Sequence, residues 1–513
     1  MVGLTLAGLF AHNRRHFGHA TALTVDGAGT SYGALARRVE DLRRVIGGTV
    51  GRGDRIAIWL PNSVAWVAGF LAAAELGAVV VPINTRLTAA EMRSIVQASG
   101  VRLLLTTDGY RGRRFFEEAV AAWPGESEAP HVLRASEAED AAFWLSWGGR
   151  PGDGAEAAPP DLLCIQYTSG TTSRPKGVML TSGSYLQTAA YVAAAQMLSP
   201  RSQFLSGSPF FHCSGSMHAI VVCQIAGCTL HTMSSWDPEK AVVLTGRFGC
   251  TASHNLFFRD VLALGGNLRS RFASMQVAAA VGTPELLLRV QDELGIPGVS
   301  NLYGMTETAG NFTMSYPDDD QEARILGNGR PQPGNALRIV VPGMEIPCAT
   351  GEEGEIQMRG PTVSAGYFRN EEMSRQAFTA DGWLRSGDLG RMGEDGGLTY
   401  VARLNDVIRT GGENVSPAEV EDAMLDLPGI QEVCVTAVAD ERLDEVPAAV
   451  VTLCPGAAPD WDRLLAGLRR SLAGYKVPRQ VYVVAALPKT ATNKVQRVLV
   501  RAQIGSAETL RVV

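Results

Sequence analysis

Between residues 20 and 110, stretches with apolar residues at helical spacing alternate with short continuous apolar runs. The helical spacing predicts helices, and the apolar runs predict buried strands. The expected helices are Tyr32–Val45, Trp66–Glu75 and Ala89–Ser99, and the expected strands are Arg55–Leu60, Val79–Val81 and Val101–Leu105. Strands that alternate with helices favour a parallel sheet with helices on its faces. The same rhythm continues from residue 180 to residue 300, where Cys228–Thr232 and Met275–Ala279 are strand candidates.

From about residue 325 to residue 403 the pattern changes to short alternating runs between glycine-rich turns. Leu337–Val341 and Glu355–Arg359 are typical of strands with one buried face, which indicates a small antiparallel, barrel-like subdomain. Residues 406–513 return to mixed helix and strand, with Ala418–Leu425 and Trp461–Leu472 helical. We therefore expect an α/β protein. It has a large N-terminal domain of doubly wound sheets with a small β-barrel-like subdomain, followed by a small α+β C-terminal domain.

Length, charge and cysteine usage narrow the classes of function. A chain of 513 residues exceeds one ordinary core, so two or more domains are expected. The net charge of −6 leaves no basic surface typical of nucleic-acid binding. The apolar stretch Val64–Ile83 contains Glu75 and Gly77, which favours a helix followed by a strand over a transmembrane segment. The N-terminus lacks the leading charges of a secretory signal, and eight cysteines without a Cys-x-x-Cys pair indicate a reduced, cytoplasmic protein.

The segment Tyr167–Gly177 carries the densest candidate chemistry. It follows the apolar run Leu162–Gln166, which predicts a buried strand. Its candidate phosphate-binding residues are Thr168, Ser169, Gly170, Thr171, Thr172 and Lys176. Small hydroxyl side chains and backbone N–H groups suit a loop that wraps phosphate oxygens, and a lysine adds a positive charge. Pro175 before the lysine and a glycine after it distinguish the loop from a Walker A motif.

The hydroxyl-rich loop closely resembles the phosphate-binding signature of the adenylate-forming superfamily. That superfamily includes acyl-CoA synthetases, firefly luciferase and the adenylation domains of peptide synthetases. Further matching segments extend the resemblance over nearly the whole chain: Asn301–Thr308, Trp383–Leu389, Tyr400–Glu419 and Pro488–Arg497. The resemblance implies an N-terminal AMP-binding domain, residues 1–404, and a mobile C-terminal domain, residues 405–513.

The resemblance also implies roles around ATP for residues in these segments. Tyr303 matches the aromatic residue near adenine, Thr306 the contact to the α-phosphate, and Glu307 the ligand of Mg²⁺. Magnesium favours one or two carboxylates together with phosphate oxygens, which is consistent with that role. Asp388 matches the residue that accepts hydrogen bonds from the ribose hydroxyls, with Ser386 in place of the usual threonine.

Two cationic residues complete the implied nucleotide site. Arg403 matches the arginine that binds ribose and phosphate. Lys494, in the C-terminal domain, matches the lysine that bridges the substrate carboxylate and the α-phosphate during adenylation. Asn493 stands before it where glycine is usual, and asparagine tolerates a positive φ better than most residues.

A further segment points to the acid that is activated. Pro209–Gly215 resembles the aromatic-histidine segment of acyl-CoA synthetases, in which the histidine, here His212, lies at the acyl pocket. Peptide-synthetase domains place an aspartate close after the phenylalanine, and its absence here disfavours an amino acid substrate. Gly282, Gly304 and Met305 are expected to face the same pocket. The expected substrate is an apolar acid of fatty, alicyclic, aryl or terpenoid type.

The implied reaction converts the acid and ATP to an acyl-adenylate and pyrophosphate, and CoA then displaces AMP to give a thioester. In the family the C-terminal domain rotates about a hinge, here Asn405, and CoA passes a glycine pair, here Gly411 and Gly412. Asn405 replaces the usual lysine or aspartate, and Ala402 replaces the usual glycine, whose backbone is freer.

Several outcomes stay open at this point. The protein completes the CoA ligase reaction, or it forms the adenylate and passes it to a partner or a carrier protein because the thioester step is weak. A luciferase-like oxygenase shares every motif, whereas a nucleotide sensor would be expected to lack Lys494 or Glu307. A homodimer is also left open.

Overall fold

The computed structural model describes residues 5–123, 129–135, 145–147, 162–168, 176–254, 257–404, 406–410, 413–440, 443–472, 474–489 and 495–504. The chain divides into two compact units. The first unit is Met1–Leu337, Met358–Leu384 and Asp395–Leu398, and the second is Arg338–Gln357, Arg385–Glu394 and Thr399–Val513. The domain boundary between residues 404 and 405 stays a prediction.

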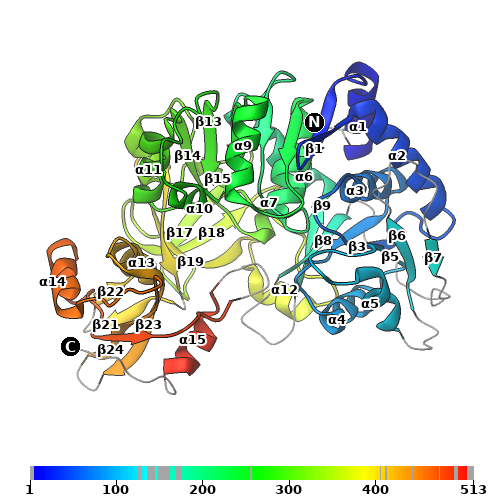
Figure 1. The fold of residues 1–513 in the computed structure, drawn as a ribbon. Helices are drawn as coiled ribbons and strands as arrows, with labels where there is room; N and C mark the ends of the chain where they lie inside the picture. Colours follow the sequence, from blue (N-terminus) through cyan, green and yellow to red (C-terminus); the bar gives the residue numbers. More distant parts are fainter. Residues whose placement is uncertain are drawn as a thin grey trace. The chain divides into compact units, whose positions relative to one another are not determined.

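Within the described residues, one sheet of the first unit has seven strands in the order β7-β6-β5-β3-β4-β8-β9 (Figure 1). The strands are β3 (Arg55–Trp59), β4 (Val79–Pro82), β5 (Leu103–Thr107), β6 (His131–Ala135), β7 (Leu145–Trp147), β8 (Leu162–Thr168) and β9 (Lys176–Thr181). From β6 to β8 the neighbours run parallel, and β7 and β9 are antiparallel additions. The predicted parallel sheet around residues 55–105 is therefore confirmed.

The helices of this region begin and end where capping residues stand. α3 (Val64–Leu76) begins after Ser63, whose Oγ accepts a hydrogen bond from the backbone N–H of Trp66 at 3.1 Å, and ends at Gly77 with φ of 69°. α4 (Ala89–Ser99) begins with a capping box and also ends at a glycine. A side-chain cap stabilises a helix by about 1 kcal/mol, and glycine adopts the left-handed conformation at the C-terminus without strain.

The apolar stretch 64–83 is α3 followed by β4, as predicted. No helix in the described part of the chain is long and apolar enough to cross a membrane. The other two predicted helices are confirmed as α2 (Tyr32–Ile46) and α4.

The second sheet of the first unit has the order β16-β15-β14-β13-β12-β10-β11-β1-β2, counted over the described residues. The strands are β1 (Thr21–Val25), β2 (Ala28–Ser31), β10 (Gln203–Leu205), β11 (Thr229–Thr232), β12 (Ala252–His254), β13 (Val277–Ala280), β14 (Gly298–Tyr303), β15 (Thr313–Met314) and β16 (Arg330–Pro331). From β1 to β14 the neighbours run parallel. The predicted strands at 228–232 and 275–279 are β11 and β13.

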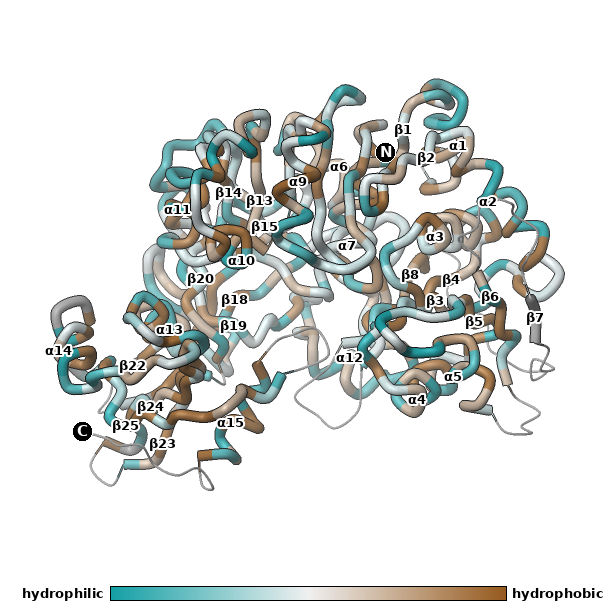
Figure 2. Tube along the Cα trace, in the orientation of Figure 1, coloured by the Kyte–Doolittle hydropathy of each residue, from teal (hydrophilic) through white to brown (hydrophobic). Residues whose placement is uncertain are grey.

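Helices cover both faces of each sheet. α2, α3, α6 (Ser182–Ala195) and the π-helix η1 (Ser216–Val221) contribute to one apolar core that the two sheets share. α4 and α5 (Phe115–Ala121) cover the outer face of the seven-stranded sheet. The outer face of the nine-stranded sheet is covered by α9 (Pro238–Phe248), α10 (Phe258–Ala263) and α11 (Pro284–Leu294). Figure 2 shows hydrophilic residues interleaved with hydrophobic ones along α4 and α5, as expected for helices with one buried face. The doubly wound α/β architecture is confirmed.

The second unit contains two smaller sheets. One has the order β17-β18-β19-β20 and is formed by β17 (Ala336–Val340), β18 (Gly354–Arg359), β19 (Leu384–Met392) and β20 (Leu398–Arg403), with most of their residues in this unit. The other is formed by β21 (Ile408–Thr410), β22 (Glu413–Val415), β23 (Ile430–Asp440), β24 (Asp444–Leu453) and β25 (Gln480–Val483). α13 (Pro417–Leu425) and α14 (Trp461–Ser471) pack on the latter sheet, where both were predicted.

Candidate active site

Predicted pocket residues follow neighbouring strands of the nine-stranded sheet. His212 follows β10, Gly282 follows β13, and Gly304 and Met305 follow β14. β10, β12, β13 and β14 are adjacent and parallel, so their carboxyl ends lie together. Ligands of open α/β sheets bind outside the carboxyl ends of the strands. We call the carboxyl ends of these four strands the strand-end site.

The turn after β14 brings Thr306 and Glu307 to the strand-end site. Gly304 has no room for a side chain, because a Cβ there would lie 2.6 Å from the Cα of Asn311. One 3₁₀ turn, η2 (Thr306–Thr308), follows, and then Ala309 with φ of 54°. A left-handed alanine costs about 1 kcal/mol or more and persists only where the surroundings hold it. The carboxylate-bearing Glu307 is 5% exposed in this turn.

Glu307 and Lys176 both contact Tyr367, which sequence analysis missed. The Tyr367 hydroxyl donates a hydrogen bond to Glu307 Oε1 at 2.7 Å, and Lys176 Nζ lies 5.2 Å from the centre of the Tyr367 ring. Burial and the Glu307 carboxylate raise the pKa of Tyr367, so the phenol keeps its proton and remains a donor. Tyr367 lies outside the named helices and strands, where no periodic pattern could mark it.

β8 and β9 form the hairpin that carries the hydroxyl-rich loop. Thr168 and Lys176 face each other across the hairpin, and the first five residues of β8 are buried, as predicted. The pairing of the two strands fixes both ends of the loop. Ser169, Gly170, Thr171 and Thr172 lie outside the described residues, so their roles stay predictions.

His212 begins a short helical turn, α7 (Cys213–Gly215), at the end of the segment that resembles the aromatic-histidine motif. Its Nδ1 accepts a hydrogen bond from the backbone N–H of Ser214 at 3.2 Å and lies 2.8 Å from Ser214 Oγ. Gly215 is required here because a Cβ at this position would lie 2.2 Å from the carbonyl oxygen of Pro209. The backbone of the turn therefore fixes the orientation of the imidazole.

Two buried amides of the seven-stranded sheet hold the residues before this histidine. Asn62, in the turn after β3, donates from Nδ2 to the Ser208 carbonyl at 2.9 Å and accepts from the Phe210 N–H at 2.7 Å. Gln166 of β8 donates from Nε2 to the Phe211 carbonyl at 2.8 Å. Leaving such buried groups unsatisfied costs about 1–3 kcal/mol each. The hydroxyl-rich loop and the histidine segment thus share β8 as a support.

In the second unit, Asp388 and Arg403 lie together as an ion pair with 2.9 Å between Oδ1 and Nε. The Asp388 side chain is 3% exposed and the Arg403 side chain 44%. Ser386 Oγ donates to the Ile356 carbonyl at 2.6 Å and accepts from the Asp388 N–H at 3.0 Å, so serine supplies a hydroxyl where threonine is usual. Burial and the nearby Asp388 carboxylate raise the pKa of Tyr400 to about 12.

The predicted hinge, the predicted CoA passage and the predicted adenylation lysine stay predictions. Asn405, Gly411, Gly412 and Lys494 lie outside the described residues. Ala402 lies in β20, is 2% exposed and has no left-handed backbone conformation, so its Cβ introduces no strain here.

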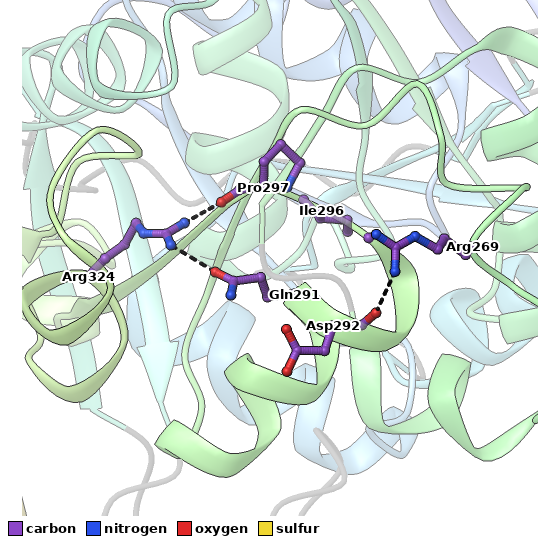
Figure 3. Close-up of a pocket in the computed structure, with 7 residues that line it drawn as sticks. Arg269, Gln291, Asp292, Ile296, Pro297 and Arg324 are labelled. Carbon is purple, nitrogen blue, oxygen red and sulfur yellow. Dashed lines mark hydrogen bonds between the residues drawn. The ribbon is translucent and has the colours of Figure 1, made fainter.

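Figure 3 shows a pocket elsewhere in the first unit, lined by Arg269, Gln291, Asp292, Gly295, Ile296, Pro297 and Arg324. Arg324 donates to Gln291 Oε1 at 2.7 Å and to the Pro297 carbonyl, and Arg269 donates to the Asp292 carbonyl at 3.3 Å. These bonds tie α11 and the residue Pro297 after it to Arg269 and to the π-helix η3 (Glu322–Leu326). None of the residues predicted for catalysis or binding lines this pocket.

Comparison with known proteins agrees with the motifs. Residues 10–368 match the family model of AMP-binding enzymes, and residues 419–494 match the model of the AMP-binding enzyme C-terminal domain. The chain is 34% identical over 458 residues to the 3-[(3aS,4S,7aS)-7a-methyl-1,5-dioxo-octahydro-1H-inden-4-yl]propanoyl:CoA ligase of Mycobacterium tuberculosis. The matched region covers 86% of this chain and 88% of that protein. It is 33% identical over 501 residues to the feruloyl-CoA synthase of an Amycolatopsis species, covering 95% and 96%.

A comparison with solved structures supports the same family. The crystal structure of ATP-bound MatB from Rhodopseudomonas palustris matches with a TM-score of 0.82 at 26% identity, over 98% of this chain and 99% of that one. The resemblance inferred from the sequence motifs is therefore confirmed. The chain belongs to the AMP-binding enzyme family, among the acyl-CoA synthetases of the adenylate-forming superfamily.

Proposed function

We propose that this acyl-CoA synthetase activates an apolar carboxylic acid at the strand-end site. The acid is converted with ATP to its acyl-adenylate and then with CoA to its thioester. The observation that carries the proposal is the contact of Lys176 and Glu307 with one side chain, Tyr367. A lysine at the start of β9 and a buried carboxylate on a common support suit a site that must hold phosphate groups in a fixed geometry.

In the first step, a carboxylate oxygen bonds to the α-phosphorus while the bond from that phosphorus to the β-phosphate oxygen breaks. Pyrophosphate leaves with the electron pair, and negative charge accumulates around the α-phosphorus. The site therefore needs electrostatic stabilisation, and no nucleophilic side chain is required. Thr306 would donate its hydroxyl to the α-phosphate, the hydroxyl-rich loop and Lys176 would hold the departing phosphates, and Lys494 would bridge the two reactants.

The residues of the site fit a magnesium ion that is bound together with the phosphates of ATP. Among the described residues, no three His, Cys, Asp or Glu side chains gather as a metal site. Glu307 would thus be a single protein carboxylate ligand, with phosphate oxygens and water as the others. The hydrogen bond from Tyr367 orients this carboxylate. When bound, the ion supplies positive charge against the phosphates.

The nucleoside is assigned to three further residues. The buried Asp388 carboxylate would accept hydrogen bonds from the ribose hydroxyls, and the partly exposed Arg403 guanidinium would reach ribose and phosphate. Tyr303, the last residue of β14, would lie against the adenine.

In the second step, the sulfur of CoA bonds to the acyl carbon while the bond from that carbon to the AMP oxygen breaks. AMP leaves with the electron pair of that bond, and the thiol proton passes to the solvent. Asn405 is the proposed hinge, and Gly411 and Gly412 the proposed CoA passage. Ala402 has no left-handed backbone conformation in β20, so the described conformation does not require a glycine at this position. The CoA ligases among the relatives favour completion of this step over transfer to a partner or a carrier protein.

Relatives narrow the proposed acid. The names of the two relatives described above specify a propanoate on a bicyclic diketone and a feruloyl group, and on that ground we propose a ring-containing acid. The eight cysteines are all free thiols, which supports a reducing compartment, and we propose the cytoplasm.

Carboxylate-dependent exchange of labelled pyrophosphate into ATP, measured over a panel of alkyl, alicyclic and aryl acids, tests the first step. We expect exchange with ring-containing acids and its loss in Lys494→Ala, with ATP binding retained. Adding CoA should then convert the adenylate to acyl-CoA and AMP. Exchange that persists in Lys494→Ala refutes that assignment, and an adenylate stable to CoA refutes the second step.

A further inference from the structure

His254 is buried at the carboxyl end of β12, within the strand-end site, yet has no hydrogen-bonding partner in the described part of the chain. It is 0% exposed, and neither Nδ1 nor Nε2 bonds to a described residue. Buried imidazole nitrogens are normally hydrogen-bonded. His254 therefore has hydrogen-bonding capacity that its described surroundings leave unused.

His231 of the same sheet provides an internal comparison. It is 1% exposed, but its Nδ1 lies 2.9 Å from Thr24 Oγ1 and its Nε2 lies 2.8 Å from Gln203 Oε1. This histidine is satisfied within the protein, as structural residues usually are. Burial in the sheet thus does not by itself leave a histidine unpartnered.

The strand register shows which face His254 is on. His254 pairs with Ala279 of β13, which pairs with Ser300 of β14, and side chains in register on parallel strands share a face. Ala279 and the next same-face residue of β12, Ala252, belong to the core beneath α6 and η1. Ser300 is 1% exposed, and its Oγ also lacks a partner among the described residues. Two polar side chains thus flank a small alanine on one sheet face.

The π-helix η1 lies between this sheet face and the turn η2, which carries Glu307. The ring of His218, in η1, lies 4.2 Å from the ring of His254, centre to centre. A Cβ on Gly310, just after the turn that carries Glu307, would lie 3.0 Å from both His218 Cε1 and Cys213 Sγ. The histidine pair therefore lies next to the segments that bear Glu307 and His212.

Both imidazoles are neutral near pH 7. Burial lowers the pKa of His254 to about 3, and burial together with the neighbouring histidines lowers that of His218. A neutral imidazole offers one N–H donor and one acceptor nitrogen. Such a ring can donate to a ketone or exchange hydrogen bonds with a hydroxyl, but it supplies no positive charge for a second carboxylate.

We propose that the acid carries a neutral hydrogen-bonding group, a ketone or a hydroxyl, away from its carboxylate, and that His254, beside His218 and Ser300, binds that group. This inference rests on the proposed function and narrows its substrate class. A wholly apolar acid would bury His254 without a partner and would be disfavoured. A diacid would place an anion against neutral rings and would be disfavoured as well.

Matched acids test the inference on the wild-type enzyme. One pair is 3-(4-oxocyclohexyl)propanoate and 3-cyclohexylpropanoate, and the other is 3-(4-hydroxyphenyl)propanoate and 3-phenylpropanoate. In pyrophosphate exchange, we expect kcat/KM to favour the ketone or the phenol in at least one pair by about 10–100-fold, the scale of one unsatisfied buried group. Equal kcat/KM within each pair that supports exchange overturns the inference.

Two substitutions of His254 distinguish a role in recognising the acid from a role in packing the protein core. His254→Leu should reduce the preference to near unity while KM for ATP stays the same, and His254→Gln should restore part of it. The matched control, His231→Leu, removes a buried histidine of the same sheet and should keep the preference. A preference that survives in folded His254→Leu overturns the inference, and if that variant does not fold, the wild-type pairs and His254→Gln decide. Exchange with none of the acids overturns the proposed function and the inference with it, whereas exchange insensitive to His254 overturns the inference alone.

Discussion

The two sheets of the first unit have the same doubly wound architecture, and one buried polar residue from each shows two different situations. In the seven-stranded sheet, Arg55 is 0% exposed, and its guanidinium donates to the carbonyls of Ser99, Gly53 and Gly100 at 2.9, 3.1 and 3.0 Å. In the nine-stranded sheet, His254 is buried equally and has no hydrogen-bonding partner among the described residues.

The comparison shows that burial alone does not mark a functional polar group. Arg55 stands at the start of β3 and binds nearby carbonyl groups, so it stabilises the sheet. His254 stands at the carboxyl end of β12, where ligands of such sheets bind. A buried polar group with local partners indicates structure, whereas one without them at a strand end indicates a binding site.

The largest effect is expected from the carboxylate of the strand-end site. Glu307→Gln should lower the rate of pyrophosphate exchange by about 10²–10³-fold, the scale of losing one preorganised electrostatic group. Glu293→Gln is the control, since Glu293 is exposed in an ion pair with Arg289 and should leave the rate nearly unchanged. Wild-type exchange in Glu307→Gln would exclude this residue from the chemistry.

The next largest effect is a difference in stability between variants of Arg55 and His254. Arg55→Met leaves three carbonyl oxygens without their donor and should lower the free energy of unfolding by about 3 kcal/mol. His254→Leu loses no hydrogen bond to a described residue and should change it by less than about 1 kcal/mol. Denaturant titration of both variants checks this, and a similar loss in both would erase the distinction.

Tyr367→Phe should have a smaller effect on the rate. It removes the hydrogen bond to Glu307 while keeping the ring under Lys176. We expect about a 10-fold fall in exchange, the scale of one hydrogen bond to a charged group, together with a higher Mg²⁺ concentration for half-maximal rate. An unchanged magnesium dependence would mean that the phenol does not orient Glu307.

The smallest effect is a dependence of stability on pH. The pKa of His254 is about 3 in the folded protein, against an ordinary value of about 6.5 when unfolded. Below about pH 6.5 the unfolded chain binds a proton that the folded chain does not. As the pH is lowered below about 6.5, the free energy of unfolding should therefore decrease by up to about 1.4 kcal/mol per pH unit. Above about pH 6.5, the contribution of His254 to the free energy of unfolding is constant. His254→Leu should have a shallower slope between pH 6 and pH 5, and identical slopes would show that His254 is not held neutral.

Much of this fold and site could be predicted from sequence. Continuous apolar runs identify β3, β4 and β5, and the motif Asn301–Thr308 selects Tyr303, Thr306 and Glu307 as candidate site residues. His254 was missed because β12 has only three residues, which show no periodicity, and its place beside β10 and β13 depends on strand order. Tyr367 was missed for a similar reason, since its contact with Glu307 joins distant segments.

The most direct test of the central claim is a crystal structure with a non-hydrolysable acyl-adenylate analogue, an acyl-sulfamoyl adenosine made from a preferred acid. The account predicts the linkage beside Thr306 and Glu307 and the acyl group at the carboxyl ends of β12, β13 and β14, against His254. An acyl group bound elsewhere, or a nucleotide away from the loop between β8 and β9, would contradict it.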